Sequence, residues 1–169
     1  MKKSVLRFGL YGAALLSILA ILPWFLEGHL SYSIREVLGY ASIVVSLSFV
    51  FFGIKHFRDV QNNGKVSFGK ALKIGVLISL FASVAFGILT VIYMTWVNPD
   101  FTAEYYGESI EQMRQALPAD EFETKVEELE AAREMFSNPG FSFLLMALTV
   151  FIIGFIISLI SSLILQRKN

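Results

Sequence analysis

Cysteine is absent from this 169-residue chain, and charged residues make up only 17% of it. Without cysteine there can be no disulfide, no thiolate nucleophile and no cysteine-bound zinc. A soluble domain would carry about 25% charged residues, whereas 55% of the residues here are hydrophobic. The positions from which charge is missing decide what class of protein this is.

Long uncharged runs divide the sequence. Residues 8–26, 37–54 and 141–165 contain no Asp, Glu, Lys or Arg, and residues 72–97 contain only Lys73. About 20 apolar residues at ~1.5 Å each cross the hydrocarbon of a bilayer, and a span must satisfy its backbone hydrogen bonds as a helix. The sequence therefore predicts an all-α protein: a four-span transmembrane helix bundle forming a single membrane domain over residues 1–169.

The first run could also be a cleavable signal peptide. It is longer than the roughly 7–15 apolar residues of a typical signal core, and it ends in Pro23-Trp24-Phe25 without a small-x-small cleavage site. Tryptophan is common at the membrane–water interface. We therefore expect residues 8–26 to remain as the first span.

Basic residues gather on one predicted side of the four spans. Cytoplasmic flanks are rich in Lys and Arg, so we expect both termini and the loop between spans two and three in the cytoplasm. The basic residues on this side are Lys2, Lys3, Arg7, Lys55, Arg58, Lys65, Lys70, Lys73, Arg167 and Lys168. Among acidic residues only Asp59 lies with them, and the other acids lie in the two segments predicted to be external.

The longer external segment, residues 98–140, carries helical periodicity. Apolar stripes at steps of three and four residues argue for amphipathic helices, and Pro118 suits the first turn of a second helix. We predict an external amphipathic helical hairpin between spans three and four, with a partly ordered acidic linker as the alternative. The stripes are Tyr106, Ile110, Met113 and Leu117, then Phe122, Val126, Leu129 and Phe136.

Small residues recur at every fourth position in three spans. Helices in lipid associate by close backbone approach along such stripes, so we predict helix-packing roles for them. An alternative is that the serines line a path for a substrate. The packing residues are Gly9, Ala13 and Ser17, then Gly75, Ser79, Ser83 and Gly87, then Gly154, Ser158 and Ser162.

Ionisable side chains are missing from the middle of every predicted span, and in transporters such residues mark proton and ion pathways. Their absence argues against a proton-coupled carrier. The two histidines, His29 and His56, fall on opposite sides of the predicted membrane and cannot share a metal. We expect no metal site, no cofactor and no catalytic residues.

Five basic residues surround the predicted cytoplasmic loop. Each is worth about 1 kcal/mol at most near an anionic membrane surface, and the same charges also serve to fix the topology. They are the candidate contacts for lipid headgroups: Lys55, Arg58, Lys65, Lys70 and Lys73.

Two sequence elements flank this loop. Gly53-Ile54-Lys55-His56-Phe57-Arg58-Asp59 ends the second span, and Ser67-Phe68-Gly69-Lys70-Ala71-Leu72-Lys73-Ile74-Gly75 opens the third. The chain resembles the Domain of Unknown Function 4199 family in these elements, in length and in its four spans. The resemblance implies a bacterial inner-membrane protein, and it implies no activity.

These observations leave competing functions. The first is an accessory or scaffolding protein that binds membrane-protein partners or lipids, with no nucleic-acid partner. The alternative is a small transporter or channel acting as a homo-oligomer, motivated by the serine-lined spans. The third hypothesis is a membrane enzyme. Its only candidate acid–base groups are Glu27, His29 and Glu36, and no feature of the sequence indicates how a substrate would be positioned beside them.

Overall fold

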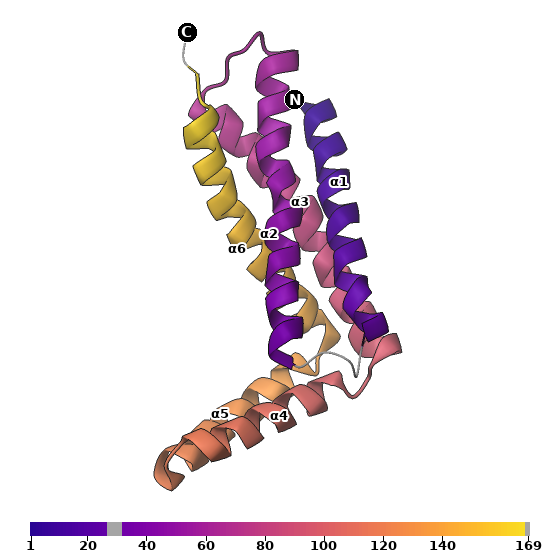
Figure 1. Cartoon of the computed structure of the whole chain (residues 1–169), viewed down its shortest axis with the longest axis vertical. Coiled ribbons are helices and arrows are strands. Elements are labelled where there is room, and N and C mark those ends of the chain that lie inside the picture. Colours follow the sequence, from indigo (N-terminus) through magenta and orange to yellow (C-terminus); the bar gives the residue numbers. More distant parts are fainter. Residues whose placement is uncertain (27–31, 168–169) are drawn as a thin grey trace. The chain divides into compact units, whose positions relative to one another are not determined.

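The computed structural model describes residues 1–26 and 32–167. Its helices are α1 (Lys2–Ile21), α2 (Tyr32–His56), α3 (Phe68–Ile92), α4 (Phe101–Ala116), α5 (Ala119–Phe136) and α6 (Pro139–Leu165) (Figure 1). The described residues contain no strand beyond one isolated bridge between Val66 and Arg167. The predicted all-α class is confirmed. The predicted connection at Glu27 and His29 lies outside the described residues.

Four helices in the described part of the chain are long and apolar enough to cross a membrane, as predicted: Lys2–Phe25, Glu36–Gln61, Phe68–Val97 and Pro139–Leu165. Three of these helices continue into a short segment of a different helix type. A 3₁₀ turn, Leu22–Leu26, follows α1, and π-helical turns follow α2 at Phe57–Gln61 and α3 at Tyr93–Val97. Several of these helices begin a few residues before the uncharged runs.

The chain forms two compact units. Unit 1 comprises Met1–Phe86 and Met146–Asn169, and unit 2 comprises Gly87–Leu145. Helices α3 and α6 each contribute to both units, because the unit boundaries fall inside them. Unit 1 therefore holds most of the span residues, and unit 2 holds the α4–α5 pair with the adjoining ends of α3 and α6.

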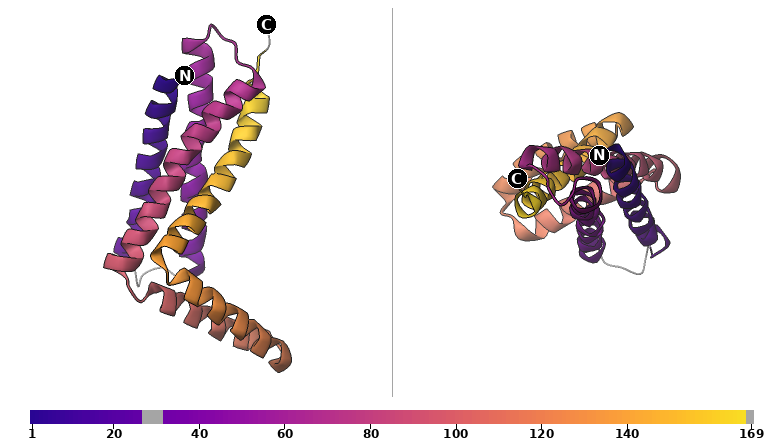
Figure 2. Two further views of the ribbon diagram at one scale, coloured as in Figure 1. Left: turned by 180° about the vertical axis from the view of Figure 1, so that it is seen from behind. Right: turned by 90° about the horizontal axis from the view of Figure 1, so that it is seen from above.

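In unit 1 the helices lie side by side as a bundle (Figure 2). Its centre is aliphatic and fully buried, at Leu16, Leu47, Val50, Ile74 and Val150 among others. Large apolar side chains also cover the outside of the bundle, with Ile18 and Ile164 each 65% exposed. Such a surface would promote aggregation in water but is the ordinary surface of a helix bundle in lipid.

Glycines let α3 and α6 approach closely. A Cβ placed on Gly154 would lie 2.5 Å from the Cβ of Ser79, and one on Gly75 would lie 2.8 Å from the Cβ of Ser158. Gly9 of α1 makes a similar contact, since its Cβ would lie 2.7 Å from the Phe81 ring. A methyl group has no room at any of these positions.

In unit 2, α4 and α5 form the predicted helical hairpin. Pro118 lies just before α5 rather than in its first turn, with φ −61° and ψ 155°. The predicted apolar stripes are the covered sides of the two helices: Tyr106 is 7% exposed, and its ring centroid lies 6.1 Å from that of Phe136. The sequence left open what the stripes would cover, and the structure packs them against each other.

Substituting Gly154→Ala tests the close approach of α3 and α6. We expect it to lower the free energy of unfolding by about 1–3 kcal/mol, the usual cost of overpacking a core. Thermal unfolding of the purified protein in detergent would measure the lowered midpoint. Gly39→Ala is the matched control, because no atom lies within 4 Å of its added Cβ. Equal midpoints for the two variants would contradict this account of the packing.

Candidate functional site

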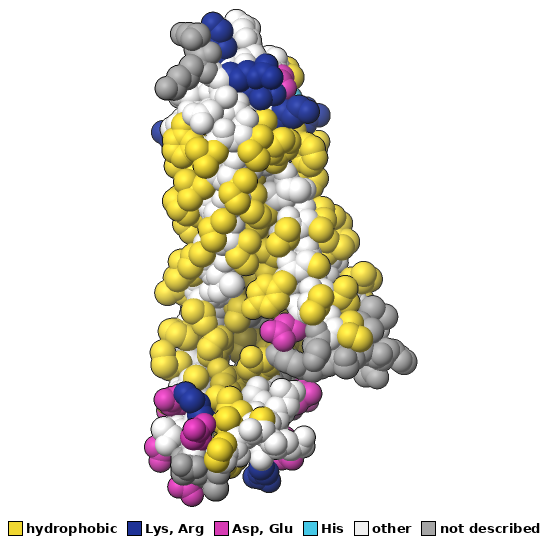
Figure 3. All heavy atoms as spheres, turned by 60° about the vertical axis from the view of Figure 1, so that its left-hand side comes forward, with side chains coloured by type: hydrophobic (Ala, Val, Ile, Leu, Met, Phe, Trp, Pro, Cys, Tyr) yellow, Lys and Arg dark blue, Asp and Glu magenta, His cyan; other side chains and the backbone are white. Residues whose placement is uncertain are grey.

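One end of unit 1 carries a group of basic residues, which we call the basic end: Lys55, Arg58, Lys65, Lys70 and Lys73. Figure 3 shows the blue side chains gathered there above a predominantly apolar surface. The end of α2, the turn that follows it and the start of α3 supply these residues. The sequence-predicted headgroup contacts therefore share one end of the bundle.

Arg58 differs from the other four, because it is only 8% exposed. Its Nε and Nη2 donate to the two carboxylate oxygens of Asp59 at 2.6 and 3.1 Å. Its Nη1 donates to the carbonyl oxygen of Leu165, the last residue of α6, at 3.4 Å. The carbonyls at a helix end lack intrahelical partners, so Arg58 satisfies one of them. Its charge thus joins the α2 end to the α6 end.

A backbone pair strengthens the same junction. The N–H of Val66 donates to the carbonyl of Arg167 at 3.2 Å, and the N–H of Arg167 donates to the carbonyl of Val66 at 2.9 Å. Just before it, Asn63 and Gly64 turn the chain with φ values of 50° and 78°. The chain therefore reverses its direction here through a left-handed backbone, which favours Asn and Gly.

The start of α1 joins this end as well. The Met1 ammonium group donates to the Gln61 side chain at 2.9 Å, and the Ser4 hydroxyl lies 3.1 Å from Nδ1 of His56. The segments around Met1, Gln61 and Arg167 therefore meet at one end of unit 1 (Figure 1). Within the described residues, no group of three or more His, Asp or Glu side chains could hold a metal ion.

Four lysines of the basic end stay exposed: Lys55, Lys65, Lys70 and Lys73. The Lys70 ammonium group lies 5.3 Å from the centre of the Phe57 ring, a cation–π contact. No ion pair involves any of the four within the described part of the chain. Their charges are therefore available to an anionic surface.

Three of the predicted packing serines form what we call the serine seam, which consists of Ser79, Ser158 and Ser162 with Gly75 and Gly154. The hydroxyls of Ser79 and Ser158 lie 3.3 Å apart. Each seam serine donates to a carbonyl one turn earlier in its own helix, Ser79 at 3.0 Å and the other two at 2.6 Å. Gly75 and Gly154 occupy the points of closest approach.

The remaining predicted packing residues lie outside this seam. Ser83 donates to the carbonyl of Leu80 at 3.0 Å, and Ser17 donates to that of Ala13 at 2.8 Å. Gly87 belongs to unit 2, where its Cβ would lie 3.0 Å from the carbonyl oxygen of Phe143.

Sequence reasoning missed several residues that act in the same way. Gly12 approaches the backbone of Ser46, and Gly53 would clash with Ile78 and Phe8 if it carried a Cβ. A glycine within a span can itself indicate a close helix contact. Gly12 and Gly53 were missed because neither lies on a stripe of small residues at every fourth position. The Ser4–His56 contact had no signal, because the two residues are distant in sequence.

The hairpin of unit 2 presents an acidic surface. Its glutamates are exposed on both helices, from Glu104 to Glu134. Two ion pairs hold glutamates of the described hairpin, Arg114–Glu111 at 3.7 Å and Lys125–Glu128 at 2.6 Å. The hydrogen bond from Lys125 to Glu128 raises the pKa of that lysine, and burial raises the pKa of Tyr106. Most of the glutamates on the hairpin are therefore not paired with a lysine or arginine of the described hairpin.

Comparison with known proteins gives a family but no activity. No curated protein and no solved structure matches the chain. The model of one family, described as "Protein of unknown function (DUF4199)", matches residues 7–167. Because this match covers nearly the whole chain, including the basic end, the serine seam and the hairpin, the chain belongs to the DUF4199 family.

Proposed function

We propose that this chain is an accessory or scaffolding protein of the bacterial inner membrane, which binds a membrane partner through its acidic hairpin. The observation that carries the proposal is that the hairpin is ordered and that its exposed surface is mostly unpaired acidic side chains. Its apolar stripes pack on each other, and most of its exposed carboxylates lack a cation. A helix pair of this kind presents ordered negative charge, which steers and selects a partner with a basic surface.

The charge distribution supports an orientation for this scaffold. The exposed lysines of the basic end lie at the same end of unit 1 as Met1 and Arg167, and Lys and Arg are enriched on the cytoplasmic side of a membrane. We assign that end to the cytoplasm, where its lysines contact anionic headgroups. The hairpin follows α3 and precedes α6, so it belongs on the opposite side of the membrane.

A second candidate, a small oligomeric channel or transporter, rests on one observation. The hydroxyl of Ser46 is buried and has no hydrogen-bond partner in the described residues, as a polar group in a substrate path would. The seam serines favour packing instead, because each already donates to its own helix and the glycines beside them touch the facing helix. The proposal includes no enzymatic step.

Single cysteines can test the orientation, because the natural chain has none. We expect Glu127→Cys to react with a membrane-impermeant maleimide in intact spheroplasts, since α5 would face outward. Lys65→Cys should react only after the membrane is permeabilised. Both side chains are exposed, so accessibility to the reagent depends on the side of the membrane. The reverse pattern of labelling would refute the orientation.

Partner binding is tested by capturing the tagged full-length chain in a mild detergent and measuring what copurifies in fixed stoichiometry. We expect the triple variant Glu123→Gln, Glu127→Gln and Glu134→Gln to retain at least ~10-fold less of that partner, because losing ~1.4 kcal/mol changes an affinity tenfold. Lys55→Gln with Lys65→Gln and Lys73→Gln is the matched control, changing three exposed charges at the basic end. A preparation containing only copies of this chain would contradict the scaffold and favour the oligomeric channel.

A flux measurement separates the scaffold from the channel alternative. Vesicles containing the protein should pass K⁺ and protons no faster than empty vesicles, because the seam hydroxyls are engaged in packing. Dyes sensitive to K⁺ and to pH would measure both fluxes. A flux that disappears when Ser79, Ser83 and Ser158 are all changed to alanine, with expression intact, would establish the pore.

A further inference from the structure

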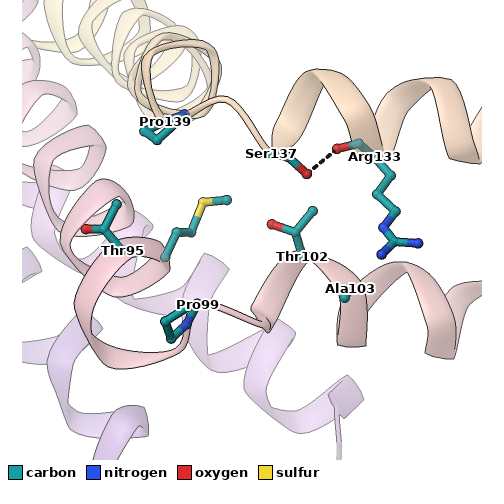
Figure 4. Close-up of a pocket in the computed structure, with 8 residues that line it drawn as sticks. Thr95, Pro99, Thr102, Ala103, Arg133, Ser137 and Pro139 are labelled. Atoms are coloured by element: carbon teal, nitrogen blue, oxygen red, sulfur yellow. Dashed lines mark hydrogen bonds between the residues drawn. The ribbon is translucent and has the colours of Figure 1, made fainter.

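Unit 2 contains a cavity of about 240 Å³ at the base of the hairpin. The turn Tyr93–Val97 after α3, the start of α4 and the end of α5 form its walls, and Pro139 at the start of α6 completes them (Figure 4). At ~30 Å³ for each water in the liquid, this volume equals about eight water molecules. That size suits a small polar group or a lipid headgroup and not a whole lipid.

One hydroxyl in the cavity wall lacks a partner. Thr102 is only 9% exposed, and no hydrogen bond to its side chain occurs within residues 1–26 and 32–167. Figure 4 shows it pointing from α4 into the cavity. The other two hydroxyls of the wall are occupied: Thr95 donates to the carbonyl of Val91 at 2.6 Å, and Ser137 donates to that of Arg133 at 2.9 Å. The Thr102 oxygen is therefore free to hydrogen-bond with a ligand or a water molecule in the cavity.

The start of α4 adds free backbone donors to the same wall. Asp100 precedes this helix and makes no side-chain capping bond, and the N–H groups of Thr102 and Ala103 have no acceptor among the described residues. The start of α6 differs, since Asn138 Oδ1 accepts from the N–H groups of Gly140 and Phe141. Uncapped N–H groups at a helix start favour an anion.

A single cation faces the cavity. Arg133 extends from α5 toward α4 (Figure 4). Acids adjoin it in the sequence at Glu130 and Glu134, yet it forms no ion pair in the part of the chain that the structure describes. A guanidinium group can hold a phosphate through two parallel hydrogen bonds. The cavity thus offers Arg133, the Thr102 hydroxyl and two backbone N–H groups to one anionic group.

The acids of the hairpin, including Glu130 and Glu134 beside Arg133 in the sequence, restrict what that ligand can be. A bare anion would be repelled by the surplus carboxylates of the hairpin, whereas a ligand that also carries an ammonium group would pair with them. Apolar side chains of the same unit lie close in sequence to the cavity wall and are exposed, with Trp96 at 81% and Leu144 at 62%. Tryptophan is typical of the membrane interface, and acyl chains would meet this surface.

From the unpartnered Thr102, the unpaired Arg133 and the acids beside them, we propose that the cavity binds a phosphodiester group that carries a primary ammonium, namely the headgroup of a phosphatidylethanolamine. The phosphate contacts Arg133, the Thr102 hydroxyl and the free N–H groups of α4. The ammonium faces the carboxylates of the hairpin. This inference is separable from the partner-binding proposal, because it depends on Arg133 and Thr102 in the cavity wall, and the partner-binding variant changes neither residue.

The experiment adds short-chain phosphatidylethanolamine, phosphatidylcholine or phosphatidylglycerol to the full-length protein in detergent and counts bound lipids by native mass spectrometry. We expect one phosphatidylethanolamine per chain, bound at least ~10-fold more tightly than either other lipid. Arg133→Gln and Thr102→Val should each weaken this binding at least ~10-fold, because each variant removes a hydrogen bond to the charged phosphate. Arg114→Gln is the matched control, because it removes the same charge from the hairpin but lies away from the cavity wall.

Each alternative outcome overturns the proposal. If Arg133→Gln and Arg114→Gln lowered the lipid affinity equally, the effect would come from the net charge of the hairpin and not from the cavity. Tighter binding of phosphatidylglycerol would mean an anion site without an ammonium requirement. Displacement of the lipid by equimolar free phosphoethanolamine would assign the site to a soluble ligand. Because Arg133 is exposed, its variant should fold, and thermal unfolding of all variants checks that a loss of binding is not a loss of structure.

Discussion

Satisfying polar groups without water is the constraint on which the rest of this structure depends. In hydrocarbon a backbone or hydroxyl group without a partner in the protein costs free energy, because no water is there to replace that partner. Ser79, Ser158 and Ser162 meet this condition by donating to carbonyls of their own helices. They then present small surfaces to the neighbouring helix, where Gly75 and Gly154 complete the contact. Van der Waals contacts between these closely approaching helices then stabilise the bundle.

The same constraint explains how a guanidinium group can be buried at the basic end. A desolvated charge costs several kcal/mol unless it is paired and hydrogen-bonded. Arg58 has the Asp59 carboxylate and the carbonyl of Leu165 as acceptors. Lysines that lack such acceptors stay exposed at the same end. Whether a basic residue serves the fold or the surface is therefore decided by the acceptors within its reach.

Much of the fold could be predicted because it depends on local patterns. Uncharged runs identified the long apolar helices, and the stripes from Tyr106 to Phe136 identified the hairpin. The remainder depends on residues that are distant in sequence. The Val66–Arg167 pair, the bond from Arg58 to Leu165 and the Ser4–His56 contact follow from how the helices cross, and no local pattern reports a crossing.

The cavity in unit 2 shows the same limit. Thr102 and Arg133 are unremarkable in the sequence, since a threonine near a helix start and an arginine among glutamates are both common. Only the folded hairpin brings them to one wall. The absence of a partner for either side chain is likewise a property of the packed structure, because it requires the positions of all neighbouring acceptors.

The joining of Val66 to Arg167 has a consequence for the order in which the protein is made. Synthesis proceeds from the N-terminus, so the segment around Val66 leaves the ribosome well before Arg167. The carbonyl and N–H of Val66 and the Nη1 group of Arg58 lack these partners until the last helix has been inserted. A chain that stalls before α6 therefore exposes this unfinished loop, and arrival of the final helix closes it.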